Sequence, residues 1–223
     1  GYSMIRQINR DCQRLLASGE NLELYARLSA GQPGEPISLN LTTHLEDLSR
    51  ALTSKLRPLP GIDYSDKFCK EALAIYIDPH QLDCAVLNLV NNSLKALSES
   101  ESATLRLSLR KSGNEAVITL TDNGPSLPAE YTERVFEPFF SLDESHRSLG
   151  LGLTVTRMIL EQSGGRVMAS FREGYGTTIS LILPLLPGLE LSSGKLFAAS
   201  PDYFARDSVL HTLLSDVVDP PMP

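Results

Sequence analysis

The stretch LNLVNNSLKAL, residues 87–97, decides how this sequence folds, because it combines the apolar spacing of a buried helix with three asparagines and a lysine. Asparagine is a poor helix former, and its amide is costly to bury unless it is paired. At 100° per residue, Asn88, Asn92 and Lys95 fall within about 60° of one another on the helix. The opposite side is apolar, with Leu82, Val86, Leu89, Val90, Leu94 and Leu97. The polar side is either a solvated surface or the wall of a site for an anionic ligand.

The composition limits the size of the core and the kinds of partner. The 223 residues are 42% hydrophobic, enough for one domain of about 150 residues with attached segments. A formal net charge of −7 disfavours nucleic acid and anionic membranes as partners. No apolar run reaches the roughly 18 residues of a membrane span, so we expect no direct membrane insertion, no signal peptide and a cytoplasmic location. Three cysteines without metal-ligand spacing indicate reduced thiols, at Cys12, Cys69 and Cys84.

The first half of the chain predicts helices that alternate with single strands. Residues 4–29 have the apolar periodicity of one helix, and AGQPGEP at 30–36 ends it as a linker. A strand at 37–41 and a helix at 42–56 should follow, with Thr42 or Thr43 as the helix cap. After a strand at 73–78, Asp78 is the expected cap of the asparagine-bearing helix, and Pro79 lies in its first turn.

The second half predicts hairpins. Strict alternation of apolar and polar residues marks strands at 103–110 and 116–122, joined by the turn SGN. About 30 residues rich in Pro, Gly and Ser follow, with one short helix near 128–135. A glycine-ended helix at 151–165 and a last hairpin, 166–184, complete the pattern. We therefore expect an α+β fold, a two-layer α/β sandwich whose mixed, mainly antiparallel sheet is covered on one face by helices and preceded by one helix.

Four short segments accompany the asparagine-bearing helix. They are TDNGPSLP (121–128), VFEPFF (135–140), SLGLGL (148–153) and GYGTT (174–178). Each of them alone is weak, because a glycine-rich run or a DNG turn is often only a turn. Their common order and spacing are far more specific.

With these motifs the sequence resembles the catalytic, ATP-binding domain of bacterial sensor histidine kinases, in the superfamily of gyrase, heat-shock chaperone, histidine kinase and mismatch-repair ATPases. The five segments match the family's N box, G1, F, G2 and terminal glycine–threonine motifs. Residues 37–186 resemble the ATP-binding domain. Residues 1–36 are similar to part of the preceding dimerisation and phosphotransfer hairpin with its linker, and residues 187–223 form a C-terminal extension.

The resemblance implies roles for the polar side of the helix. Asn92 matches the family's Mg²⁺ ligand, and an amide oxygen is a hard donor suited to that ion. Asn88 stands where related ATPases have a catalytic glutamate, and an amide cannot act as a base. This change suits a kinase, whose nucleophile is a histidine from elsewhere. Lys95 matches a basic position that contacts phosphate.

The other motifs imply the rest of an ATP site. Asp122 would accept a hydrogen bond from the adenine amino group and repel the carbonyl oxygen of guanine. Gly124 would let the backbone pass close to the base, with Thr177 beneath it. The backbone N–H groups of Gly150, Leu151 and Gly152 would face the phosphates, at a helix start that favours anions. Three aromatic residues would anchor a lid at 141–149, namely Phe136, Phe139 and Phe140.

Two serines depart from the family pattern. Ser126 and Ser148 stand where glycines are expected, and serine takes a positive φ only at a cost. The phosphoacceptor histidine is also missing from its usual place on the first hairpin helix. Of His44, His80, His146 and His211, only His44 has a superficially similar context, THLED, and it lies beyond the linker.

The resulting hypothesis is a kinase domain that uses ATP and Mg²⁺ to phosphorylate a histidine-containing hairpin of the same or another chain. A response regulator receiver domain is the implied downstream partner, and the apolar stripe of residues 4–29 predicts a homodimer. The alternative is a degenerate, non-catalytic module that binds a partner protein. Residues 194–218 are similar to the first strand and helix of a receiver domain, although Ser200-Pro201-Asp202 replaces the usual acidic pair; a packing appendage is the other reading.

Overall fold

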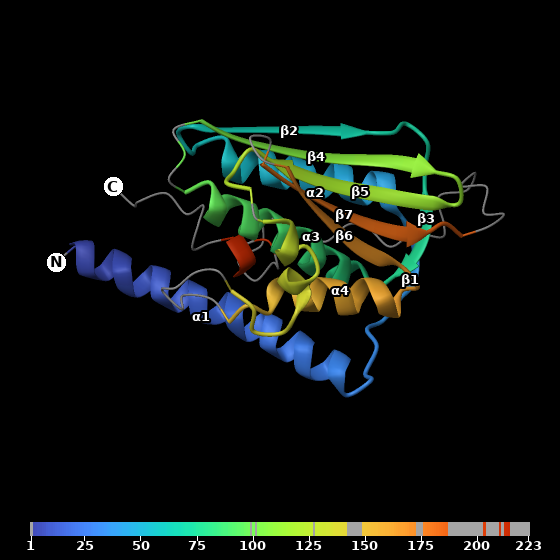
Figure 1. Cartoon of the computed structure of the whole chain (residues 1–223), viewed down its shortest axis with the longest axis horizontal. Helices are drawn as coiled ribbons and strands as arrows, with labels where there is room; N and C mark the ends of the chain where they lie inside the picture. Colours follow the sequence, from blue (N-terminus) through green and yellow to red (C-terminus); the bar gives the residue numbers. More distant parts are fainter. Residues whose placement is uncertain are drawn as a thin grey trace.

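The computed structural model of the chain is drawn in Figure 1. It describes residues 2–98, 100, 102–126, 128–141, 149–172 and 176–186, together with residues 203, 210 and 212–214. Side chains are described from Leu15 onward, except those of residues 129 and 172. Ser148, His146, His211 and most of the predicted lid and tail lie outside the described residues.

A five-stranded sheet forms one layer of the molecule. Its strand order is β2-β4-β5-β7-β6, and only the β2–β4 pair is parallel. The strands are β2 (Ile62–Phe68), β4 (Ala103–Ser112), β5 (Glu115–Asp122), β6 (Arg166–Arg172) and β7 (Gly176–Pro184). A separate antiparallel pair joins β1 (Ile37–Asn40) to β3 (Ala74–Ile77). The predicted mixed, mainly antiparallel sheet is thereby confirmed.

Three helices form the second layer, against one face of the sheet, as Figure 1 shows. They are α2 (Leu41–Leu56), α3 (Pro79–Ala96) and α4 (Gly152–Gln162). The long N-terminal helix α1 (Tyr2–Ser29) contacts α4 on the side away from the sheet. Two short 3₁₀ turns, η1 (Ala129–Tyr131) and η2 (Arg134–Phe136), replace the single short helix expected near 128–135.

The core lies between these two layers and follows the alternation of the strands. Leu105, Leu107 and Leu109 of β4 are buried, and Ala116, Ile118 and Leu120 of β5 are buried beside them. The apolar side of α3 meets this surface, with all six of its predicted apolar residues at most 3% exposed. Burying a side chain of this size stabilises the fold by about 1.5–3 kcal/mol, so the pattern fixes which side of α3 is turned away from the sheet.

Local differences from the sequence-based expectations have simple causes. Asp78 caps α3 as predicted, and its carboxylate accepts hydrogen bonds from the N–H groups of His80 and Gln81. For α2, however, the N-cap is Asn40, whose side chain accepts from the Thr43 N–H, and the predicted threonine caps are wrong. Thr42 is inside the helix, where its hydroxyl instead donates to the Glu71 carbonyl oxygen at 2.7 Å.

The two ends of the described chain both pack on the domain. On α1, Leu24 and Leu28 are buried, while the other half of the apolar stripe remains 47–72% exposed, at Leu15, Leu16 and Leu22. Near the C-terminus the described residues Tyr203, Leu210, Leu213 and Leu214 belong to the hydrophobic core. Among the helices that the structure describes, none has both the length and the apolar character of a membrane span.

Candidate nucleotide site

The polar side of α3 lies toward α1 and α4, and burial along it falls from one end to the other. Asn88 is only 2% exposed, Asn92 is half-buried and Lys95 is exposed. The Asn88 amide donates to the Asn21 side-chain oxygen at 2.8 Å and to the Gly152 carbonyl oxygen at 3.2 Å, and it accepts from the Asn21 amide at 3.1 Å. Because an unpaired buried amide is costly, this pairing explains how the helix tolerates Asn88. The interpretation of the whole polar side as solvated is wrong at this residue.

Asp122 lies at the end of β5 and is 4% exposed. One carboxylate oxygen accepts from the N–H groups of Gly124 at 3.0 Å and Thr177 at 3.3 Å. The other oxygen accepts from the Ser93 hydroxyl at 2.6 Å. These hydrogen bonds fix the carboxylate between α3, the loop after β5 and the start of β7. Asp122 and Gly124 of one motif are therefore brought together with Thr177 of another.

The glycine-rich run precedes α4 and needs its glycines for steric reasons. Gly150 has φ +64°, and a Cβ there would overlap the backbone of Phe140. Gly152 lies against the Asn88 amide, where a Cβ would come within 3.2 Å of the side-chain oxygen. Leu151, between them, is the N-cap residue and buries its own side chain. Only the backbone of this run is thus available to a ligand.

Among the described residues, no side chain caps the N-terminus of α4, and the N–H groups of its first turn carry the positive end of the helix dipole. The hydroxyl of Thr154 in this turn is buried and without a hydrogen-bond partner among the described residues. An anion is the natural partner for such a helix end.

The aromatic cluster does not behave as one unit. Phe136 is buried, while Phe139 is 63% exposed and has a positive φ of 63°, a strained conformation for a bulky residue. Phe139 meets Tyr25 of α1 edge-on, with ring centroids 6.0 Å apart. Phe140 instead packs with Tyr131 at 5.7 Å, and the Arg134 guanidinium lies over its ring at 5.1 Å. The lid that these residues were expected to anchor lies mostly outside the described residues.

Several contacts of the site were not predicted from the sequence. Ser93 orients Asp122, Asn21 pairs with Asn88, and Gly176, with φ +83°, approaches Asp122 so closely that a Cβ would overlap its backbone. Phe139 is the only non-glycine residue with a positive φ among those that the structure describes. Ser126 therefore avoids the costly backbone conformation that its place in a glycine position suggested. Its hydroxyl lies 3.4 Å from the Gly176 carbonyl oxygen.

His44 lies elsewhere, in a buried cluster between α2, α3 and the C-terminal residues. Its ring nitrogen is 2.7 Å from a carboxylate oxygen of Asp83, and the Tyr203 hydroxyl donates to the same oxygen at 3.0 Å. His44 is 2% exposed. Burial, followed by the charge of Asp83, raises the pKa of Tyr203 well above its ordinary value. A residue so enclosed is a structural group, not an accessible nucleophile.

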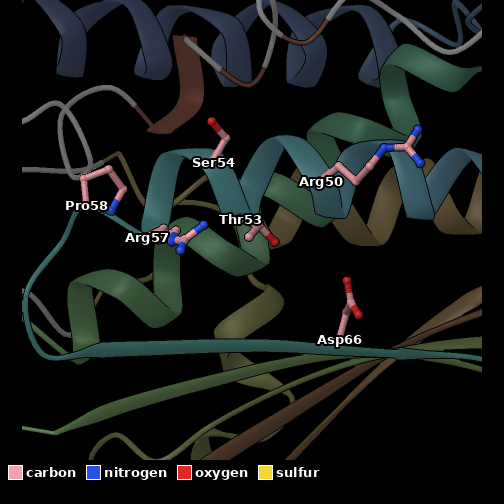
Figure 2. A pocket seen from close by; sticks show the side chains of 6 residues that line it. All are labelled: Arg50, Thr53, Ser54, Arg57, Pro58 and Asp66. Atoms are coloured by element: carbon pink, nitrogen blue, oxygen red, sulfur yellow. The ribbon is translucent and has the colours of Figure 1, made fainter.

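A pocket of about 560 Å³ opens on another part of the surface, between α2 and β2. Figure 2 shows the six side chains that line it, Arg50, Thr53, Ser54, Arg57, Pro58 and Asp66. None of them belongs to the five motifs, so we do not assign the nucleotide site to this pocket. The motif residues instead line the region between α3, α4 and the end of β5.

Comparisons with known proteins agree with this geometry. A family profile described as "Histidine kinase-, DNA gyrase B-, and HSP90-like ATPase" matches residues 77–187. The sensor protein RstB of Escherichia coli (strain K12) is 33% identical over 187 residues, which cover 80% of this chain and 41% of RstB. The alginate biosynthesis sensor protein KinB of Pseudomonas aeruginosa is 30% identical over 183 residues, 82% of this chain and 30% of KinB.

A solved structure of the catalytic domain of histidine kinase ThkA superimposes with a TM-score of 0.60 at 25% identity, covering 69% of this chain and 100% of that domain. The fold and the motifs define the class, the ATPases of the histidine kinase, gyrase and heat-shock chaperone type. Within it, this chain contains an ATP-binding catalytic domain of the sensor histidine kinase type. It spans less than half the length of either sensor protein that it matches.

Proposed function

We propose that this chain transfers the γ-phosphate of ATP, bound with Mg²⁺, to a histidine supplied by another segment or chain. The observation that carries the proposal is the buried Asp122 carboxylate. It is held at the end of β5 by Ser93, Gly124 and Thr177, and the start of α4 contacts the same helix α3 through Gly152 and Asn88. The Asp122 carboxylate, which can accept a hydrogen bond from adenine, and the N–H groups of α4, which can donate to phosphate, then lie on the same side of the domain.

The adenine end of the proposed site uses Asp122. Its oxygens already accept three hydrogen bonds, which orient the carboxylate and leave further lone pairs, because an ionised carboxylate has about four acceptor positions. The adenine amino group would donate to one of them. Guanine presents a carbonyl oxygen at the same position and would be repelled. Gly124 keeps the neighbouring space free of a side chain, and Thr177 supplies a polar surface beside it.

The phosphate end uses the backbone of Gly150, Leu151 and Gly152 together with the exposed ammonium of Lys95. Backbone N–H groups at a helix start bind phosphate oxygens without a side-chain rearrangement. The hydroxyl of Thr154, unpartnered among the described residues, adds a further donor in the first turn of α4. Phosphoryl transfer needs mainly positioning and charge neutralisation, which these groups provide.

Asn92 is the residue that fits Mg²⁺. Its amide oxygen is a hard donor, the side chain is half-buried, and among the described residues it has no side-chain hydrogen-bond partner that a ligand must displace. Bound there with the nucleotide, Mg²⁺ would neutralise phosphate charge. Asn88, one turn earlier, is already committed to Asn21 and Gly152 and cannot accept a proton as a base. This arrangement would favour transfer to a histidine over attack by water.

The proposed partners follow from the family and from α1. ThkA has been solved in complex with the response regulator protein TrrA, which supports a receiver domain as the recipient in this system too. The exposed leucines of α1, at 47–72% exposure, offer an apolar stripe for a second helix, so we propose a homodimer through this helix.

The alternative function is a non-catalytic module that binds a partner protein. One observation favours it, since α1 pairs with Asn88 and Phe139 and thereby covers part of the candidate site. Under this alternative, nucleotide binding is weak or structural, and no phosphate is transferred.

The test is transfer from γ-labelled ATP to a separately produced hairpin that carries an acceptor histidine. We expect acid-labile label on the hairpin with the wild-type chain and with the control variant Asn114→Ala, which changes an exposed turn residue. Label should be lost with Asn92→Ala. Nucleotide binding without any transfer to hairpins from several sensor kinases would support the non-catalytic module and overturn the proposed kinase.

A further inference from the structure

Three side chains outside the nucleotide motifs meet between α1 and the first turns of α3. The Glu20 carboxylate lies 3.4 Å from Nε2 of His80 and 4.0 Å from Sγ of Cys84, and Nδ1 of His80 lies 3.8 Å from the same sulfur. Each residue offers one ligand atom such that all three atoms lie within 4.8 Å of one another. The spacing of Cys84 relative to the other cysteines gave no hint of this cluster, because the partners are a histidine and a residue 64 positions away.

The geometry of the cluster fits a tetrahedral zinc ion. His80 and Cys84 are four residues apart on α3 and therefore project from the same side of the helix. With Zn–S near 2.3 Å and Zn–N and Zn–O near 2.0–2.2 Å, the ligand atoms of a tetrahedral site are separated by about 3.3–3.6 Å. With a single ring nitrogen of His80 as the ligand, the three ligand atoms lie within 4.8 Å of one another, at most about 1.5 Å beyond this range. Rotation of the Glu20 and His80 side chains would have to close this gap when the ion binds.

The local charge also suits a cation. Burial raises the pKa of the Cys84 thiol well above its ordinary value, and the negative charges of Glu20, Asp83 and Asp78 raise it further. Without a cation the group therefore stays a neutral thiol. A divalent ion would reverse this balance, since it is attracted by the same carboxylates and stabilises the thiolate that binds it.

We propose that Glu20, His80 and Cys84 bind one Zn²⁺ ion, with water in the fourth position, and that the ion clamps α1 onto α3. On binding, the Cys84 thiol gives up its proton to solvent, and the thiolate, a neutral imidazole nitrogen and the carboxylate coordinate the metal. Imidazole and thiolate are ligands that select zinc over Mg²⁺ or Ca²⁺. Entry is open, because the His80 side chain is 55% exposed and that of Glu20 28% exposed.

The position of the cluster gives the ion a regulatory consequence that rests on the proposed function. His80, Cys84 and Asn88 follow one another at intervals of four along the same side of α3. On α1, Glu20 is adjacent to Asn21, which pairs with Asn88. Zinc at Glu20 would therefore hold Asn21 on Asn88 and keep α1 beside the candidate nucleotide site. Release of the ion would free α1 to move relative to the catalytic domain.

Metal binding is tested first, without nucleotide, on tag-free protein in a thiol-free reductant. Titration with Co²⁺ should give one equivalent with the visible bands of a tetrahedral ion and the near-ultraviolet band of a cobalt–thiolate bond, and Zn²⁺ should displace it. The variant Cys84→Ser should lose the thiolate band, and His80→Asn should weaken Zn²⁺ binding at least about tenfold. The control Cys69→Ser, a thiol outside the cluster, should behave as the wild type.

The clamp is tested by hydrogen exchange. Saturating Zn²⁺ should slow amide exchange in residues 17–28 of the wild type and of Cys69→Ser, and it should leave exchange in His80→Asn unchanged. His80 is exposed, so its replacement does not endanger folding. A thiolate band that persists in Cys84→Ser, or equal Zn²⁺ affinity in His80→Asn and wild type, would overturn the site. Because neither measurement uses ATP, a failure of the kinase proposal would leave these results unaffected.

Discussion

Replacing Asp122 by asparagine removes one negative charge from the buried end of β5 while hardly changing the size of the side chain. The amide oxygen can still accept from the N–H groups of Gly124 and Thr177, which now share one carboxylate oxygen. The new NH₂ group faces the Ser93 hydroxyl, which can rotate to accept instead of donate. The folded protein thus loses charge assistance, and the second N–H of the new NH₂ group has no partner among the described residues, so we expect a cost of about 1–3 kcal/mol in the free energy of unfolding.

The same change should also weaken ATP binding. The adenine amino group would donate to a neutral amide oxygen already shared by two N–H groups, or it would face the donor NH₂ group. A hydrogen bond to a charged group contributes about 1.5–3 kcal/mol, and each 1.4 kcal/mol is tenfold in Kd. We therefore expect the Kd for ATP to rise about 10- to 150-fold in Asp122→Asn.

The assay is titration calorimetry of ATP and GTP at a fixed Mg²⁺ concentration. The matched control is Asp63→Asn, which makes the same chemical change at an exposed position of β2 and should leave the Kd unchanged. The adenine-reading role of Asp122 is refuted if Asp122→Asn binds ATP as tightly as Asp63→Asn, or if the wild type binds ATP and GTP equally well.

Three further predictions concern the metal, the acceptor and the C-terminal residues. In thermal unfolding, Asn92→Ala should lose the Mg²⁺-dependent part of the stabilisation by ATP, whereas Asn114→Ala should keep it. Incubated alone with γ-labelled ATP, the chain should gain no stable label, because His44 is buried against Asp83; label that disappears in His44→Ala would contradict this. Above pH 10 the unfolded state loses the Tyr203 proton before the folded state, so stability should fall by up to about 1.4 kcal/mol per pH unit. Because Cys84 and Tyr64 also have raised pKa values, denaturant unfolding of Tyr203→Phe should show a slope shallower by up to about 1.4 kcal/mol per pH unit, and an unchanged slope would rule out the buried proton.

The strands of the core were predictable because their apolar residues alternate strictly. The cap of α3 by Asp78 was also predictable, because an aspartate followed by a proline is typical of a helix start. Strand β2 was missed. Its sequence, IDYSDKF, places charges on a strand at the edge of the sheet, where one side faces water and alternation is weak. Strand β2 is held by hydrogen bonds to its parallel partner β4. The paired residues Ile62 and Ala103 are 41 positions apart, so the pairing leaves no signal in the local sequence.

The candidate site was predictable where a motif fixed the chemistry and unpredictable where a contact crosses the chain. Asp122 and the glycines of residues 150–152 were named through the resemblance of their motifs to the family, and their roles in nucleotide binding stay predictions. Nothing in the local sequence indicates that Asn21 pairs with Asn88 across 67 positions, because a single amide on an exposed helix has no periodicity. Ser93 was missed for the same reason, since a serine inside a helix is ordinary until its buried partner is known.

The central claim, that the region between α3, α4 and the end of β5 binds ATP with Mg²⁺, is tested most directly by one titration. ATP is added to the wild-type chain by calorimetry, first with Mg²⁺ and then with the metal chelated. We predict binding of one ATP per chain that is tighter with Mg²⁺ than without it. No binding at millimolar ATP in either condition would contradict the account.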